Sequence, residues 1–327
     1  MSDLESLAQR TADELVKNRA GAVVGVLAGD DSAVRAAGSA GTDDVFEIGS
    51  ITKVFTALAL ARLTVAGTVS LDDPLAALLP PDAKVPSRDN TPITLRHLAT
   101  HTAGLPRLPT GMLPRLLLHP NDPDPYAGCT TPMLLAALAR TRLAATPGKR
   151  FRYSNFGAGL LGLALARRAG TTYADLIARE TALPIPDPAR LIQGHTRRGR
   201  ATPPWHLADM AGAGALHSTA GDLLAFLRHQ LDHADDPAIR LTREVKHQIN
   251  PFTWIHLGWM GRKLHARLGG QTHLWHNGGT AGFSSFAGFD PDNRVGVVLL
   301  SNTQRPLDQP ATDLLRALAP STASSEA

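Results

Sequence analysis

Ser50 and Lys53 are the residues whose types and spacing most clearly suggest chemistry. Residues three apart on a helix share a face, so a helix that begins near Ser50 would bring the hydroxyl and the amine together. A serine hydroxyl is a weak nucleophile near neutral pH, and a lysine can serve as its base when burial favours the neutral amine. The pair predicts an activated nucleophile, and the alternative is a capping serine followed by an ordinary solvated lysine.

The residues that follow Lys53 predict a buried helix. The stretch Val54–Leu60 is almost wholly apolar, and Leu63 continues it. A helix that is apolar on all sides packs inside a protein rather than on its surface. Gly67 is the residue type that commonly ends a helix in the left-handed conformation. A nucleophile at the start of this helix would face free N–H groups, which favour developing negative charge.

Two further short motifs could serve such a nucleophile. Tyr153 and Asn155 stand just before an apolar helical pattern, where a phenol can relay protons and an amide can orient a carbonyl. The segment Leu274–Thr280 holds two glycines that would let a substrate approach the backbone closely. Taken alone, each motif has an ordinary structural interpretation, namely a packed tyrosine with a helix-capping asparagine and a glycine turn.

The composition excludes several classes of function. Hydrophobic residues make up 43% and charged residues 19% of the 327 residues, as in a soluble globular protein. The net charge of +4 is spread thinly, and aromatic residues are only 5%, so nucleic-acid binding is not expected. The one tight basic run, Thr196–Arg200, is interpreted as a solvated loop. Cys129 is the only cysteine, so neither an internal disulfide nor a thiolate metal cluster is expected, and no cofactor is predicted.

The N-terminal sequence favours a cytoplasmic protein. The first six residues are polar and acidic, and no basic segment followed by an apolar core is visible there. No run of about 20 apolar residues could cross a bilayer, so no membrane association is expected.

The predicted elements describe a sheet built from both ends of the chain. Ser2 and Glu5 fit a capping box for a helix that reaches about Lys17. The prediction is an antiparallel sheet with helices inserted in the middle. Strands are expected over 22–28, 32–37, 283–289 and 294–300, and further helices over 132–143, 155–168 and 309–318. The expected units are residues 1–69 with 215–319, a helical unit over 70–214 that includes an irregular loop over 105–126, and a disordered tail over 320–327.

In this order, the three motifs resemble those of the serine β-lactamase and penicillin-binding superfamily, in particular its class C, DD-peptidase and esterase branch. The Ser-x-x-Lys motif is Ser50–Lys53, the Tyr-x-Asn motif is Tyr153–Asn155, and the Lys/His-x-Gly motif is His276–Gly278. Connecting phrases over 71–74, 93–105 and 214–222 fit as well, so the similarity runs from about residue 20 to 302.

The resemblance implies a fold and an acyl-enzyme mechanism. The fold would be α+β, with a five-stranded antiparallel sheet flanked by helices, a mostly helical inserted domain, and the site between them. Ser50 would attack an ester or amide carbonyl, while Lys53 and Tyr153 would share the acid and base roles. The N–H groups of Ser50 and Gly279 would form the oxyanion hole.

The resemblance also implies roles for the remaining motif residues. Asn155 would position Lys53 and the acyl amide, and His276 would border the site from the sheet edge. Branches that bind penicillins usually carry Thr or Ser at the position of Asn277 and often carry Lys at that of His276. We therefore expect weaker recognition of a substrate carboxylate at the third motif, which ends at Gly278.

These departures favour a cytoplasmic esterase or acyltransferase over a β-lactamase or a D-alanyl-D-alanine carboxypeptidase. The expected partner is a small-molecule acyl donor, with water or a second metabolite as the acyl acceptor. The alternative of another class is a catalytically silent protein that only binds a ligand.

Overall fold

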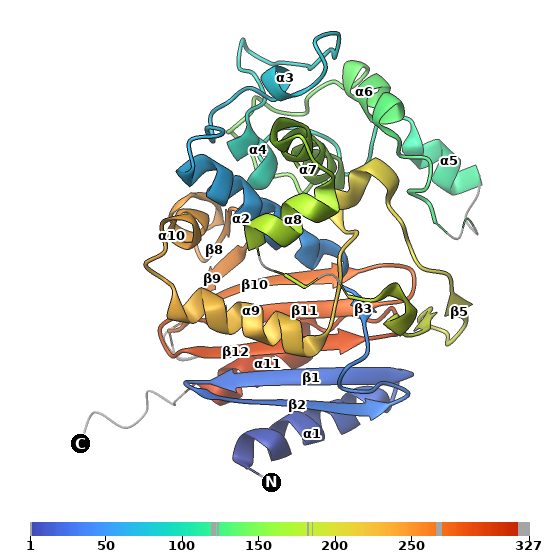
Figure 1. The fold of residues 1–327 in the computed structure, drawn as a ribbon, viewed down its shortest axis with the longest axis vertical. Helices are drawn as coiled ribbons and strands as arrows, with labels where there is room; N and C mark the ends of the chain where they lie inside the picture. Colours follow the sequence, from blue (N-terminus) through green and yellow to red (C-terminus); the bar gives the residue numbers. More distant parts are fainter. Residues whose placement is uncertain are drawn as a thin grey trace.

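The computed structural model describes residues 2–118, 122, 124–181, 183–184, 186–265 and 270–319. An antiparallel sheet of eight strands crosses the molecule in the order β2-β1-β12-β11-β10-β9-β8-β7 (Figure 1). Its strands are β1 Gly21–Ala28, β2 Asp31–Gly38, β7 Lys246–Asn250, β8 Thr253–His256, β9 Met260–Lys263, β10 Thr272–Gly279, β11 Ser284–Asp290 and β12 Val295–Ser301. Two short pairs lie outside it, β3 Phe46–Glu47 with β6 His217–Ser218, and β4 Gly194–His195 with β5 Ala201–Thr202.

Helices cover both faces of the sheet and fill the region beyond it (Figure 1). The α-helices are α1 Asp3–Val16, α2 Thr52–Val65, α3 Leu75–Leu78, α4 Leu95–Ala99, α5 Met112–Leu118, α6 Thr131–Ala139, α7 Asn155–Ala169, α8 Tyr173–Thr181, α9 Ala220–Asp232, α10 Pro237–Glu244 and α11 Asp308–Leu318. The 3₁₀ turns are η1 Gly49–Ile51, η2 Pro188–Arg190 and η3 Ala208–Ala213. No helix in these described ranges is both long enough and apolar enough to span a bilayer.

Both ends of the chain contribute to one sheet, as the sequence predicts. Strand β1 pairs antiparallel with β12, and Ala22 lies opposite Ser301. Both strands are buried almost throughout, which explains why their sequences are continuous apolar runs rather than alternating ones.

The implied number of five strands is wrong, because β9, β8 and β7 extend the sheet beyond β10. Strand β7 lies at the edge, and its residues alternate between exposed and half-buried. Such a strand has no fully buried face, so its sequence lacks the apolar period by which strands are recognised.

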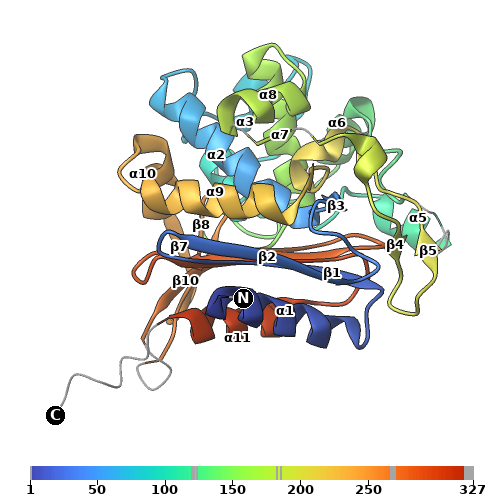
Figure 2. The same ribbon diagram turned by 60° about the horizontal axis from the view of Figure 1, so that its bottom comes forward.

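One face of the sheet is covered by the first and last helices, α1 and α11 (Figure 2). Leu15 of α1 and Leu315 of α11 share an apolar cluster with Val24 and Leu299 of the sheet. The capping box at the start of α1 is confirmed, because the Ser2 side chain accepts from the N–H of Glu5 and the Glu5 carboxylate accepts from the N–H of Ser2.

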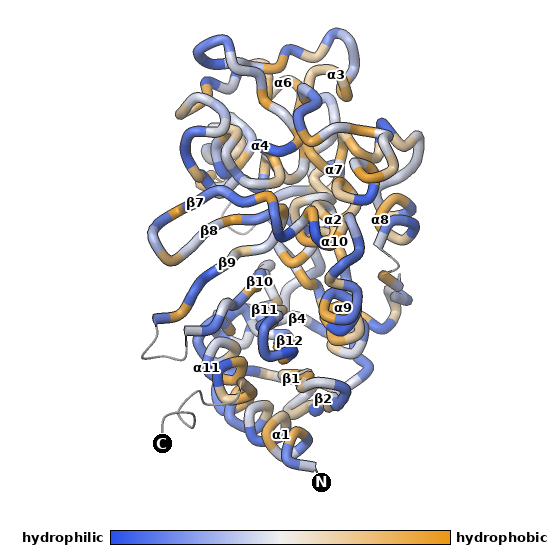
Figure 3. Tube along the Cα trace, turned by 90° about the vertical axis from the view of Figure 1, so that its left-hand side faces the viewer, coloured by the Kyte–Doolittle hydropathy of each residue, from blue (hydrophilic) through white to orange (hydrophobic). Residues whose placement is uncertain are grey.

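The other face packs against a second core that contains α2 and α9. Every residue of α2 from Thr52 to Ala61 is buried, which confirms the prediction of an interior helix. Hydrophobic segments gather around α2, whereas the outer loops are hydrophilic (Figure 3). Gly67 follows the helix with φ +70°, the left-handed conformation predicted for it.

The remaining predictions have mixed outcomes. The helices predicted over 155–168 and 309–318 are confirmed, but α6 ends at Ala139, four residues before the predicted end. The stretch 105–126 is not wholly irregular, because α5 lies within it. The division at residues 69 and 215 stays a prediction, and the tail over 320–327 lies outside the described residues.

Candidate active site

Ser50 lies in the 3₁₀ turn η1, which runs directly into α2, and not in the first turn of α2 as the sequence suggested. Lys53 is nevertheless within reach, since its Nζ is 2.9 Å from Ser50 Oγ. Lys53 Nζ also donates to the backbone carbonyl of Ala213 at 2.6 Å. This carbonyl holds the Lys53 amine against Ser50. A backbone carbonyl has no side-chain motif, so the sequence alone did not predict this contact.

The surroundings of Lys53 favour its neutral form. Its side chain is buried, and burial lowers the pKa well below the ordinary value of 10.5. The positive charge of Arg107 lowers the pKa further. No carboxylate in the described part of the chain forms an ion pair with Lys53 to oppose these effects. A neutral amine beside a hydroxyl is the arrangement that general-base activation of serine needs.

Tyr153 stands beside the same pair, just before α7. Lys53 Nζ is 5.0 Å from its ring centroid and Arg107 Cζ is 5.3 Å from it, while the buried His101 ring packs on it with the centroids 4.4 Å apart. Burial raises the pKa of Tyr153 to about 12, although a hydrogen bond with Ser50 and the charge of Arg107 act in the opposite direction. The phenol is therefore protonated near neutral pH and can donate a proton.

The third motif brings a free strand edge against the serine. Strand β9 pairs with β10 only from Thr272 to Trp275, so the backbone of residues 277–279 is unpaired on that side within the described sheet. A Cβ on Gly278 would lie 2.1 Å from the Ile48 carbonyl oxygen and 3.0 Å from the Ser50 nitrogen. Only glycine permits this approach, and a Cβ on Gly49 would likewise lie 2.7 Å from the Gly279 nitrogen. The end of β10 thus lies close to the turn that carries Ser50, as an oxyanion hole made by Ser50 and Gly279 would require.

His276 is buried beside Tyr153, with the ring centroids 6.3 Å apart. Its Nδ1 lies 2.6 Å from the carbonyl oxygen of Asn277, and its Nε2 has no hydrogen-bond partner. Burial lowers the pKa of His276 to about 3. The imidazole is therefore neutral and supplies no positive charge at the third motif.

The two asparagines make contacts that the sequence did not predict. Asn155 donates through Nδ2 to the Tyr126 hydroxyl at 3.4 Å, and it makes no described hydrogen bond to Lys53. Its buried Oδ1 has no partner and remains free to accept a hydrogen bond from a substrate amide. Asn277 donates through Nδ2 to Asp308 Oδ1 at 2.7 Å, so the middle residue of the third motif is hydrogen-bonded to a carboxylate.

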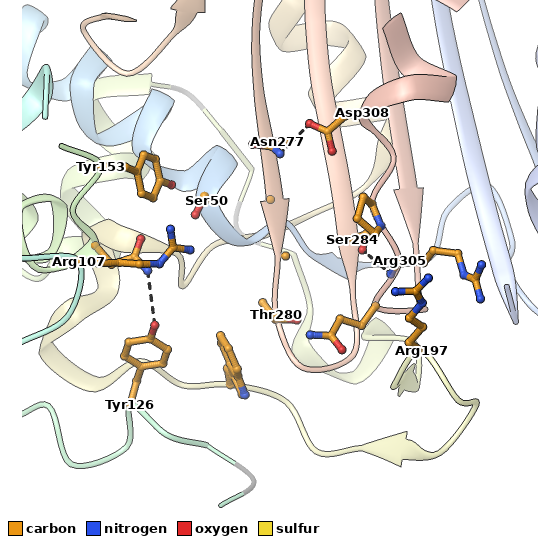
Figure 4. A pocket seen from close by; sticks show the side chains of 16 residues that line it. Ser50, Arg107, Tyr126, Tyr153, Arg197, Asn277, Thr280, Ser284, Arg305 and Asp308 are labelled. Atoms are coloured by element: carbon orange, nitrogen blue, oxygen red, sulfur yellow. Dashed lines mark hydrogen bonds between the residues drawn. The ribbon is translucent and has the colours of Figure 1, made fainter. Parts of the chain in front are cut away.

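These motifs line one cavity of about 680 Å³ (Figure 4). Sequence reasoning missed several of its lining residues, which are Arg107, Tyr126, Arg197, Trp205, Thr280, Ser284, Gln304, Arg305, Pro306 and Asp308. Arg107 and Tyr126 belong to the loop over 105–126. The irregular sequence of that loop was the only indication that it contributes to the cavity. The Thr196–Arg200 run is largely exposed, as predicted, yet Arg197 also lines the cavity.

Comparison with known proteins gives the same assignment as the motifs. The family model described as Beta-lactamase matches residues 8–320, almost the whole chain. The chain belongs to the beta-lactamase family. The D-alanyl-D-alanine-carboxypeptidase/endopeptidase AmpH of Escherichia coli K12 is 30% identical to it over 292 residues, covering 81% of this chain and 72% of that protein. A beta-lactamase of Lysobacter lactamgenus is 24% identical over 311 residues, covering 82% of this chain and 76% of that protein.

Solved structures share the fold of this family member. A beta-lactamase/D-alanine carboxypeptidase from Yersinia pestis complexed with citrate has a TM-score of 0.77 and 24% identity, covering 96% of this chain and 99% of that one. A D-stereospecific amidohydrolase from Streptomyces has a TM-score of 0.75 and 24% identity, covering 98% and 99%. The fold is β-lactamase-like, and the family supports serine hydrolase activity.

Proposed function

We propose that the protein is a serine hydrolase that forms an acyl-enzyme on Ser50 and prefers simple esters to β-lactams. The observation that carries the acyl-enzyme is the neutral Lys53 amine 2.9 Å from the Ser50 hydroxyl. A catalytically silent binding protein would have no need of a buried lysine held against a serine by a backbone carbonyl.

The reaction follows from these groups. Ser50 Oγ bonds to the acyl carbon as its proton passes to Lys53, and the N–H groups of Ser50 and Gly279 receive the negative charge on the carbonyl oxygen. As the bond to the leaving group breaks, the Tyr153 hydroxyl passes a proton to the departing oxygen and regains one from Lys53. Water, or a second metabolite acting as acyl acceptor, then takes the acyl group by the reverse sequence.

The third motif supports the preference for esters. The carboxylates of penicillins and of D-alanyl-D-alanine lie on the leaving-group side of the bond that is cleaved, where they would approach Asn277. The Asn277 amide already donates to Asp308, and His276 beside it is neutral. A charge-assisted contact is worth about 1.5–3 kcal/mol, so its absence should weaken binding of such a carboxylate by about tenfold to a hundredfold.

Similarity to AmpH favours a second candidate, the D-alanyl-D-alanine carboxypeptidase reaction. One experiment separates the two candidates: kcat/KM is measured on a single preparation for 4-nitrophenyl butyrate, benzylpenicillin and a D-alanyl-D-alanine peptide. We expect the ester to be cleaved most efficiently, and we expect Asn277→Thr to raise the penicillin-to-ester ratio by about tenfold. Ser50→Ala serves as the inactive control. Faster turnover of the penicillin or the peptide by the unmodified enzyme contradicts the ester preference.

A further inference from the structure

Two arginines are held together at one end of the active-site cavity. The N–H of His195 in β4 donates to the Asn302 carbonyl at 2.9 Å, and the N–H of Gln304 donates to the His195 carbonyl at 2.9 Å. His195 thereby forms a parallel bridge with Thr303. In a parallel register the two chains advance together, so Arg197 and Arg305, each two residues further on, reach the same part of the cavity wall (Figure 4).

Neither guanidinium has a partner in the described part of the chain. No ion pair or side-chain hydrogen bond joins Arg197 or Arg305 to another described residue, and the Nε of Arg305 is shielded from solvent without a partner. The only carboxylate among the described lining residues is Asp308, which accepts a hydrogen bond from Asn277. Two cationic groups that line the same cavity without a counter-charge create a positive potential there, and this potential would attract an anion.

A third arginine fixes this arrangement from behind. Arg19 is buried and donates to the backbone carbonyls of Arg305 and Pro306, the latter at 2.7 Å. Burial, together with the nearby charge of Arg305, lowers the pKa of Arg19 to about 10, so it stays cationic near neutral pH. The backbone that carries Arg305 is therefore held in place, and the local positive potential is increased.

The position of the two arginines relative to Ser50 determines which part of a substrate they would meet. In Figure 4, Tyr153 lies on one side of Ser50, and Arg197 and Arg305 lie on the other. The leaving group must face Tyr153 to receive its proton, so the acyl group extends in the opposite direction, toward the arginines.

We propose that Arg197 and Arg305 form a subsite for a carboxylate at the far end of the acyl group, so that the preferred substrates are half-esters of dicarboxylic acids. The proposal rests on the proposed function, because it names the acyl group that Ser50 would receive. Guanidinium groups bind carboxylates through paired, charge-assisted hydrogen bonds, which suits two arginines that have no other partner.

The test compares charged and neutral esters of equal acyl length. Monoethyl succinate, glutarate and adipate are paired with ethyl butyrate, pentanoate and hexanoate, and ethanol release gives kcat/KM for each ester. We expect at least one half-ester to exceed its neutral partner by tenfold or more at low salt, with the ratio falling as ionic strength rises. Arg197→Gln combined with Arg305→Gln should lower that ratio at least tenfold. Arg198→Gln, an exposed neighbour off the cavity wall, should leave it unchanged.

The outcomes separate the subsite from the proposed function. A ratio near one for all three pairs, or a ratio that the double variant preserves, overturns the subsite while leaving ester hydrolysis intact. If no ester is hydrolysed, the subsite is tested by binding instead. Calorimetry then measures the affinity of the Ser50→Ala variant for monoethyl adipate and for ethyl hexanoate. Tighter binding of the half-ester that the arginine substitutions abolish supports the subsite, and equal binding overturns it. Thermal unfolding checks each variant, and Arg197→Gln alone carries the test if the Arg305 variant fails to fold.

Discussion

At the scale of single residues, the proposed mechanism depends on keeping one lysine neutral and one tyrosine protonated. Lys53 is buried without a carboxylate partner in the described structure, and Arg107 contributes a positive charge from the cavity wall. Burial also raises the pKa of Tyr153 to about 12, although the charge of Arg107 acts in the opposite direction. We propose on the basis of these opposite shifts that the amine is the base and the phenol the acid, a division that the motifs alone left open.

The acidic limb of the profile of kcat/KM against pH should follow the deprotonation of Lys53. Below its lowered pKa the amine is protonated and cannot accept the Ser50 proton, so kcat/KM for a neutral ester should rise with pH and level off well below 10.5. Arg107→Gln removes a nearby cation, so it should raise the pKa of Lys53 and move this limb to higher pH. His276 cannot produce the limb, because its pKa is lowered to about 3.

The matched control for this profile is Arg150→Gln, an exposed arginine that does not line the cavity. Its profile should coincide with that of the unmodified enzyme. If Arg107→Gln leaves the limb where it was, or moves it to lower pH, the role assigned to the Arg107 charge is wrong.

At the scale of elements, the free edge of β10 must press against η1. The Ser285 hydroxyl donates to the Ile48 carbonyl at 2.7 Å, which ties β11 to the backbone just before η1. Because Gly278 has no side chain, the backbone of β10 can also lie directly against Ile48 and Ser50. The proposed oxyanion hole would therefore be a product of strand-to-turn packing rather than of a single loop.

Gly278→Ala should damage both folding and catalysis. The added Cβ would lie 2.1 Å from the Ile48 carbonyl oxygen, so the strand or the turn must move. Overpacking of this kind typically costs about 1–3 kcal/mol of stability, and displacement of the Gly279 N–H should slow acylation by about 10²-fold or more. Chemical denaturation and single-turnover acylation by 4-nitrophenyl butyrate measure the two effects.

Gly279→Ala is the control for stability, because a Cβ there would meet only the Phe283 carbonyl oxygen, at 3.7 Å. We expect its free energy of unfolding to match that of the unmodified chain. Equal stability of the Gly278 and Gly279 variants would contradict the close approach of β10 to η1.

At the scale of the whole molecule, three segments distant in sequence meet at Ser50. The turn before α2 supplies Ser50, the proposed nucleophile, the residues before α7 supply Tyr153, and β10 supplies the backbone edge. The sequence predicted this meeting because each motif has its own residue signature and because the two chain ends read as partners in one sheet.

Other parts of the site could not be predicted from the sequence. The carbonyl of Ala213 has no side-chain signature, and the contact of Asn155 with Tyr126 depends on how the loop over 105–126 folds. Arg197 and Arg305 come together only through the bridge between His195 and Thr303. Such contacts join segments whose separate sequences say nothing about each other, so they become visible only in the folded chain.

The central claim is that Ser50 is the nucleophile, and mapping a fluorophosphonate adduct by mass spectrometry tests it most directly. We expect one adduct per chain, on the peptide that contains Ser50, and no adduct in Ser50→Ala with its fold intact. Lys53→Ala should react about 10²–10⁴-fold more slowly, because the hydroxyl loses its base. An adduct on another residue, no adduct on folded protein, or near-normal labelling of Lys53→Ala would contradict the account.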